Sequence, residues 1–226
     1  MSIETQKIFD YLYHKFSWGE ARSKLPSIFN TFACCSYDAA NDRYIVNSKF
    51  KAINFDKLTK WLFQHQDVVP QSADAMCFSG NDIFLIEFKA GNQIKTEWNK
   101  NKLIKGVSGK IDGSGETILN SILPDVHNLN SAAVQLRFYL VVDSEAMGID
   151  AQIMTLLPRL KGLTFRDIPP TGDVTIDTLI NEVLISLNES AQINDCYKDI
   201  DIWFSEAFDI YLTAYGIKDI RNMVKY

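Results

Sequence analysis

The sequence predicts a mixed α/β fold in which helices flank a central sheet. Apolar residues recur at helical spacing over 3–16 and 55–66, two apolar strands joined by a tight turn occupy 73–90, and a β-branched and aromatic run fills 136–142. With 226 residues, 46% of them hydrophobic, the chain can bury a sizeable core. We expect one elaborated domain with a mixed sheet of four or more strands.

The N-terminal part alternates predicted helices with one predicted strand. In the helix over 3–16, Ser2 is the expected N-cap. A second helix is expected around 20–33, a strand at 43–47 and a helix in FDKLTKWLFQHQ, residues 55–66. The sequence Val-Val-Pro ends that last helix and leads into the hairpin segment.

The middle of the chain predicts a glycine-rich link before the central strand. GVSGKIDGSGE, residues 106–116, is expected to be a flexible connection because its glycines weaken a helix. A short helix over 117–123 is stopped by Pro124. LRFYLVV, residues 136–142, is typical of a strand buried on both faces.

The C-terminal part is expected to be mainly helical. Residues 150–160 predict a helix and 163–168 a strand, after which PPTGD at 169–173 marks a break. Helices are expected in DTLINEVLISL (177–187) and IDIWFSEAFDIYLTAYG (200–216).

We interpret the whole chain, 1–226, as a single domain with a core over about 1–168. Residues from about 173 to 226 then form a helical C-terminal extension that covers this core. The aromatic segment WFSEAFDIYLTAY is expected to be core or the contact of a homodimer.

Composition argues against several classes of protein. A net charge of −5 and a pI near 5.2 do not suit a generally basic nucleic-acid coat protein. Four cysteines without a CxxC and three scattered histidines give no zinc spacing, so buried, reduced thiols are expected. There is no cationic start followed by an apolar run and no stretch of membrane-spanning length, so we expect a cytoplasmic protein without membrane contact.

A carboxylate pair is the feature of ADAMCFSGNDIFLIEFKAG, residues 73–91, that needs explaining. If Gly80-Asn81 forms the hairpin loop, residue numbers of facing positions sum to 161, and Asp74 stands opposite Glu87. Facing side chains have Cβ atoms about 5 Å apart, so two carboxylates placed this way repel each other. The register therefore predicts a cation between them.

Two readings of this carboxylate pair are open. Lys89, two residues after Glu87 on the same face, offsets part of the repulsion, whereas carboxylate oxygens are the ligands that Mg²⁺ and Mn²⁺ prefer. Alternatively, Glu87 and Lys89 form a solvated pair at an exposed strand end, worth at most about 1 kcal/mol. The apolar surroundings and the facing Asp74 favour a metal site.

A basic stretch follows the carboxylates directly. Residues 89–110 hold one acid, Glu97, and six lysines, which are Lys89, Lys95, Lys100, Lys102, Lys105 and Lys110. Such a stretch in an otherwise acidic protein indicates a footprint for a polyanion, although a solvated helix face has the same composition. We expect Lys95, Lys102, Lys105 and Lys110 to contact nucleic acid.

Asp74 followed after twelve residues by Glu87-Phe88-Lys89 resembles the PD-(D/E)XK nuclease superfamily. Ala73 stands where the family has proline. The resemblance implies a restriction-endonuclease-like fold, a mixed four-stranded sheet between helices in α-β-β-β-α-β order.

The resemblance also implies roles for the motif residues. Asp74, Glu87 and the backbone carbonyl of Phe88 would hold Mg²⁺ or Mn²⁺, and Lys89 would orient or help deprotonate the attacking water. An acidic residue of the first helices often completes such sites, and Glu20 and Glu4 are the candidates.

Three functional hypotheses follow. The first is a metal-dependent nuclease, either endonuclease or exonuclease-like, acting on nucleic acid and on DNA in particular. The second is an inactive or regulatory nucleic-acid- or protein-binding module that retains the nuclease fold. The third is an unrelated α/β protein with a chance E-x-K triplet.

Overall fold

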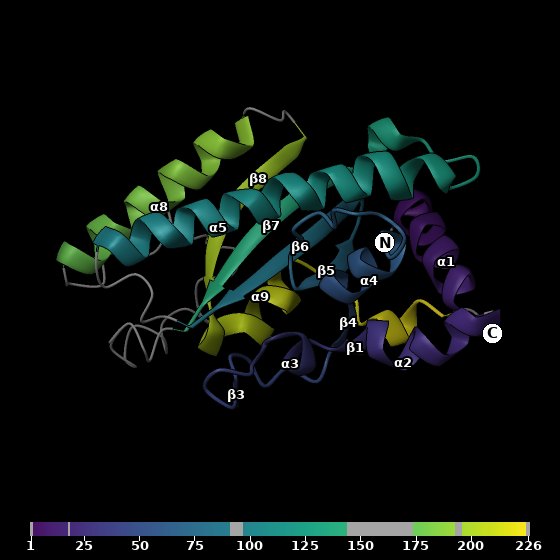
Figure 1. The fold of residues 1–226 in the computed structure, drawn as a ribbon, viewed down its shortest axis with the longest axis horizontal. Coiled ribbons are helices and arrows are strands. Elements are labelled where there is room, and N and C mark those ends of the chain that lie inside the picture. The colour runs from purple at the N-terminus through teal and green to yellow at the C-terminus, as the bar shows by residue number, and fades with distance from the viewer. Residues whose placement is uncertain (1, 18, 91–96, 144–173, 193–195, 225–226) are drawn as a thin grey trace.

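The computed structural model describes residues 2–17, 19–90, 97–143, 174–192 and 196–224 (Figure 1). Its centre is a six-stranded mixed sheet in the order β1-β4-β5-β6-β7-β8. The strands are β1 (Phe29–Thr31), β4 (Lys51–Asn54), β5 (Ala75–Ser79), β6 (Asp82–Lys89), β7 (Gln135–Val142) and β8 (Tyr197–Phe204). Neighbours are antiparallel from β1 to β6 and parallel from β6 to β8.

Helices cover both faces of this sheet. They are α1 (Ile3–Ser17), α2 (Leu25–Ile28), α3 (Phe32–Cys35), α4 (Phe55–Leu62), α5 (Glu97–Glu116), α8 (Val174–Gln192) and α9 (Phe208–Ala214). The long helices α5 and α8 lie side by side over one face (Figure 1). Helix α9 packs on the other face, where the ring of Phe208 lies 5.6 Å from that of Phe88. The expected mixed α/β class, a sheet flanked by helices, is confirmed.

The β5–β6 hairpin has the register that the sequence predicts. Ala75 faces Ile86 and Ser79 faces Asp82, so facing residue numbers sum to 161 as expected. Gly80 takes φ +55°, a left-handed conformation that glycine adopts without strain. Because β7 and α5 cover it, β6 is buried over most of its length and Glu87 is fully buried.

Several other predicted elements are confirmed. Helix α1 begins after Ser2, whose Oγ accepts a hydrogen bond from the Thr5 N–H at 3.3 Å. Helices α4 and α8 and strand β7 also lie where the periodicity places them. The regions 150–160, 163–168 and 169–173 lie outside the described residues.

The prediction for residues 20–47 is wrong in most details. The expected helix over 20–33 is broken into η1 (Gly19–Lys24), α2, β1 and α3, because Pro26 and the β-branched and aromatic run that follows favour short elements. The expected strand at 43–47 is only β3 (Arg43–Tyr44), which pairs with β2 (Tyr37–Asp38) apart from the main sheet.

The helix expected over 200–216 is also wrong in its first half. Residues up to Phe204 form β8, which extends the sheet parallel to β7. The 3₁₀ helix η8 (Ser205–Ala207) and helix α9 (Phe208–Ala214) follow it. Ile202 and Trp203 are both fully buried although their side chains point to opposite faces. A strand buried on both faces lacks the alternation that would separate it from a helix.

All four cysteines are free thiols. Cys35 and Cys77 are buried as expected, but Cys34 is exposed and Cys196 is half-buried. In the described part of the chain, no helix is long and apolar enough to cross a membrane.

The expected flexible link over 106–116 is instead the second half of α5. Two of its glycines allow the helix to approach the chain at Gln71. A Cβ on Gly113 would lie 2.1 Å from the Gln71 carbonyl oxygen, and one on Gly109 would lie 2.6 Å from Gln71 Oε1. These glycines therefore serve close packing, which sequence composition does not distinguish from flexibility.

We expect Gly113→Ala to lower the free energy of unfolding by about 1–3 kcal/mol, because the added methyl group overlaps the backbone of Gln71. Gly106→Ala is the matched control, since its Cβ meets nothing within 4 Å. Alanine there should stabilise the helix by about 0.5–1 kcal/mol. Denaturant unfolding measures both, and equal effects would contradict the packing role of Gly113.

Candidate functional site

Two carboxylates and two lysines converge at the carboxyl end of β6. Lys110 Nζ lies 2.7 Å from Glu87 Oε2 and 3.5 Å from Asp74 Oδ1. Lys89 Nζ lies 2.6 Å from Glu87 Oε1. The structure thus brings together all three residues of the Asp-Glu-Lys motif, and it adds Lys110 to them.

Backbone hydrogen bonds fix Asp74 just before β5. Its N–H donates to the Ile86 carbonyl at 3.0 Å, and its Oδ2 accepts from the Phe88 N–H at 2.8 Å. The regular pairing ends at Ala75, so Asp74 is offset by one position from the expected place opposite Glu87. Both side chains nevertheless reach the same lysine, so they share one face of the hairpin.

The Phe88 carbonyl faces the same side. In a strand, the N–H and C=O of one residue point to the same neighbour, and successive residues alternate. The Phe88 N–H bonds to Asp74, whereas the Lys89 carbonyl accepts from Asp143 N–H on the β7 side. The Phe88 carbonyl is therefore directed toward Asp74.

Helix α5 carries Lys110 to the carboxylates. Leu103, Val107 and Ile111 are buried on its inner side, which fixes the rotation of the helix on the sheet. Lys110 lies beside this apolar stripe, with 24% of its side chain exposed. Its ammonium therefore reaches Glu87 while remaining accessible to solvent.

Burial and mutual repulsion shape the charges of the site. Burial, with the Glu87 carboxylate as a further cause, raises the pKa of Asp74 to about 7, although Lys110, the Phe88 N–H and Lys89 oppose the shift. Burial alone would lower the pKa of Lys110, but Glu87 and Asp74 hold it above its ordinary value. The carboxylates thus need a cation, and Lys110 supplies one.

The oxygens of this site fit a hard divalent cation. Glu87 Oε1 is buried and has no hydrogen bond of acceptable geometry, despite its short contact with Lys89. With Asp74 and the Phe88 carbonyl it offers an all-oxygen set of the kind that suits Mg²⁺ or Mn²⁺. In the described ranges, no three His, Cys, Asp or Glu side chains cluster as a metal site.

Of the two acidic candidates of the N-terminal helices, Glu4 lies away from the site. Glu4 Oε1 lies 3.0 Å from Lys7 Nζ, and its Oε2 accepts from the Asn130 N–H at 2.8 Å. These contacts lie near the hairpin turn, at the opposite end of β6, so the prediction for Glu4 is wrong. Glu20 belongs to η1, but its side chain lies outside the described part of the structure.

The predicted lysine footprint is only partly available for binding. Lys102 and Lys105 are exposed on α5, whereas Lys95 lies outside the described residues. Lys100 is 8% exposed and pairs with Glu182 of α8 at 2.5 Å, which gives it a structural role. Lys110 is directed at the carboxylates, a role that its sequence position did not reveal.

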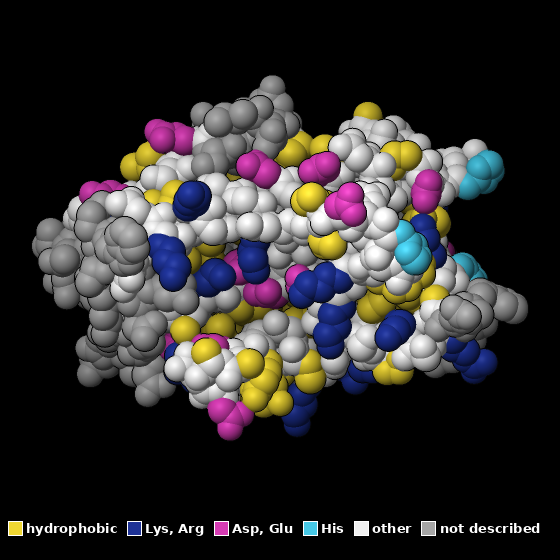
Figure 2. All heavy atoms as spheres, viewed as in Figure 1, with side chains coloured by type: hydrophobic (Ala, Val, Ile, Leu, Met, Phe, Trp, Pro, Cys, Tyr) yellow, Lys and Arg dark blue, Asp and Glu magenta, His cyan; other side chains and the backbone are white. Residues whose placement is uncertain are grey.

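Basic residues also lie on the other side of the carboxylates. Figure 2 shows acidic side chains in the middle of one face, with lysine and arginine side chains on both sides of them. Lys24, Lys57 and Lys60, which sequence reasoning missed, line one pocket beside α4. The signal was present in FDKLTKWL, where Lys57 and Lys60 are one helical turn apart.

A separate pocket of about 380 Å³ lies beyond the carboxyl ends of β7 and β8. Arg43 and Asp143 in its wall form an ion pair at 2.5 Å, and Glu206 and Asp209 add further acidic groups. This acidic lining does not suit a phosphate, so the pocket is not part of the basic surface.

No protein-family model matches the chain, and a search of curated proteins finds no match to it. The chemistry of the four side chains is therefore the basis for a functional proposal.

We expect Lys110→Met to destabilise the protein by about 2–3 kcal/mol in chelator, because it leaves two carboxylates with only Lys89 to offset them. Mn²⁺ should restore more stability to this variant than to the wild type. Urea unfolding with and without Mn²⁺ measures both effects. Lys102→Met on the exposed surface is the control, and an equal loss there would contradict the bridging role of Lys110.

Proposed function

We propose that this protein is a metal-dependent nuclease that hydrolyses phosphodiester bonds, with DNA as the first expected substrate. The observation that carries the proposal is the convergence of Asp74, Glu87 and Lys89 at a buried strand end. A buried carboxylate pair is costly for folding, so its presence suggests use in function.

The fold supports this proposal. The elements α1, β4, β5, β6, α5 and β7 follow the α-β-β-β-α-β order that the PD-(D/E)XK resemblance implies. The short elements η1, α2, β1, α3, β2 and β3 are inserted between α1 and β4, and α4 is inserted between β4 and β5. We therefore infer a restriction-endonuclease-like core. The C-terminal part would add α8 and α9 as cover and β8 as one more strand.

Each residue has a separate task in the proposed reaction. Asp74, Glu87 and the Phe88 carbonyl would hold Mg²⁺ or Mn²⁺, which supplies charge neutralisation and a more acidic water. Lys89, on the face of Glu87, can orient the attacking water. With a bound ion, Lys110 would no longer be needed between the carboxylates. Its ammonium could then donate to an oxygen of the scissile phosphate.

A second function, a binding module without catalysis, is favoured by one observation. The described residues provide no third acidic ligand, and Lys110 already offsets the two carboxylates. Under this alternative, the protein would bind nucleic acid through its lysines in the absence of metal.

We expect the wild type to cut nucleic acid with Mg²⁺ or Mn²⁺ and to lose this activity in chelator. Asp74→Asn, Glu87→Gln and Lys89→Ala should each lower the cleavage rate at least about 100-fold, because each removes a charge that acts on the reacting groups. Single-stranded, duplex and branched DNA and RNA are the substrates, with gel electrophoresis as the readout.

Glu4→Gln is the control, since Glu4 lies at the opposite end of β6 and its variant should cut normally. Cleavage that persists in chelator and in Asp74→Asn would overturn the nuclease proposal. Salt-sensitive binding without cleavage would support the binding module instead.

A further inference from the structure

A basic pocket of about 290 Å³ lies between α4 and the residues at the end of η1 and in α2. It is lined by Lys24, Ser27, Ile28, Lys57, Lys60, Trp61 and Gln64. We propose that this pocket binds the phosphate backbone of the nucleic acid on one side of the cleaved bond. This inference rests on the proposed nuclease function and adds a binding site to it.

The lining carries an excess of positive charge. Lys24, Lys57 and Lys60 are all exposed, and one of them, Lys60, pairs with Asp56 at 2.6 Å. Within the described part of the chain, no ion pair involves Lys24 or Lys57. Two of the three ammonium groups are therefore available to an incoming anion.

The framework of the pocket is held in place by packing. Asn54 caps α4, its Oδ1 accepting from the Lys57 N–H at 2.9 Å. The ring of Trp61 lies 4.6 Å from that of Phe16 on α1, and Ile28 is buried beneath the pocket. The lysines thus extend from fixed backbone positions, and half-buried Trp61 presents an apolar surface for a sugar or base.

The pocket is tied to the carboxylates through α4. The Phe55 N–H donates to the Asp74 carbonyl at 3.0 Å, so this helix begins at the backbone of a proposed metal ligand. Lys60 is five residues further along, roughly 7.5 Å of helix rise.

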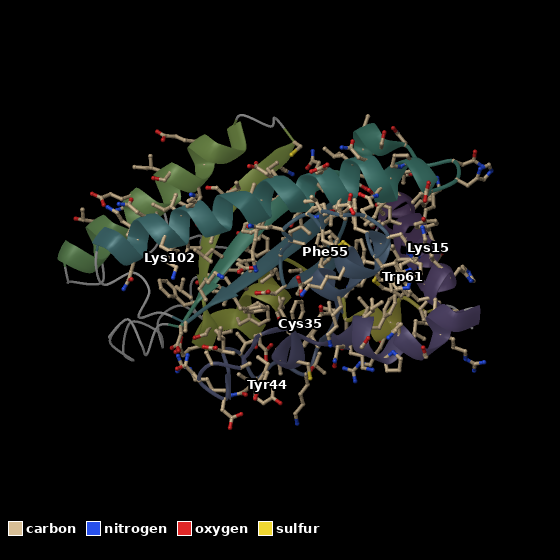
Figure 3. All side chains as sticks on the ribbon, in the orientation of Figure 1. Lys15, Cys35, Tyr44, Phe55, Trp61 and Lys102 are labelled. Atoms are coloured by element: carbon tan, nitrogen blue, oxygen red, sulfur yellow. The ribbon has the colours of Figure 1, made fainter. Side chains whose placement is uncertain are left out.

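The pocket residue Trp61 and the α5 residue Lys102 lie on opposite sides of Phe55, whose N–H donates to the Asp74 carbonyl (Figure 3). Figure 2 shows the acidic centre in the same view. A strand crossing the carboxylates would therefore meet lysines before and after the cleaved bond. This arrangement fits an extended polyanion, which contacts several separated ammonium groups at once.

The test measures binding in chelator, where no cleavage occurs. Fluorescence anisotropy of labelled single-stranded and duplex oligonucleotides is followed between 50 and about 200 mM salt for each variant. Lys24→Ala combined with Lys57→Ala, which removes the two lysines without an ion pair, should lower the salt-dependence slope by about 1–2, because each lost phosphate contact removes about 0.7–0.9. Affinity should fall at least about tenfold at the lowest salt.

The matched control removes the same charge elsewhere. Lys198 and Lys218 are exposed, and they lie at the hairpin-turn end of the sheet: Lys198 is at the start of β8, and the Lys218 N–H bonds to the Phe78 carbonyl. Lys198→Ala combined with Lys218→Ala should leave the slope unchanged. Equal losses in both double variants would overturn the pocket assignment, since they would report net charge alone.

Further outcomes separate this inference from the nuclease proposal. If the wild type cuts DNA and the Lys24/Lys57 variant binds as tightly as the wild type, only the pocket assignment fails. If the wild type neither binds nor cuts, both fail. The pocket assignment would also be overturned, in favour of a small-anion site, if millimolar inorganic phosphate competes with the oligonucleotide and affinity does not depend on oligonucleotide length. Melting temperatures equal to that of the wild type verify that the variants are folded.

Discussion

The arrangement of the site depends on the ion pairs that the Lys110 ammonium makes with Glu87 and Asp74. Glu87 is fully buried in β6, and an uncompensated carboxylate there would cost several kcal/mol. Lys110 offsets this cost from above the sheet, so the charge pair also attaches α5 to the β5–β6 hairpin. The close approach of Gly109 and Gly113 to Gln71 keeps α5 at the height and rotation that this contact requires. Packing and electrostatics therefore constrain the same helix.

The hairpin could be predicted because its information is local. Ser-Gly-Asn-Asp sets the loop, the alternation of side chains sets the faces, and the register then brings Asp74 to Glu87 within one position. The remaining offset at Asp74 depends on its hydrogen bonds to Ile86 and Phe88, which no pattern of residue types reveals. The motif residues were thus accessible to sequence reasoning, but their detailed geometry was not.

Other errors arose where distant parts of the chain decide the structure. Strand β8 takes its conformation from β7, with which it pairs, and its apolar residues fit a helix equally well. The glycines of α5 suggest flexibility by composition alone. Their packing role is hidden because Gln71, which they contact, precedes them by some forty residues. The cluster of Lys24, Lys57 and Lys60 is not apparent in the sequence, because Lys24 meets the other two only in the fold. A net charge of −5 likewise hides a surface on which lysines surround a small acidic centre.

The hydrogen bond from the Phe88 N–H to Asp74 has a consequence for the entropy of ligand capture. Because the main chain of β6 restrains this carboxylate and burial restrains Glu87, few side-chain rotations would remain to be lost on binding of the proposed cation. The adjustment would instead fall on Lys110, a long side chain that would gain freedom on leaving the carboxylates. The entropy lost in ordering the site and the entropy gained by the released lysine would then offset each other. Because the carboxylates are already restrained, exchange of one cation for another would require little movement of the backbone.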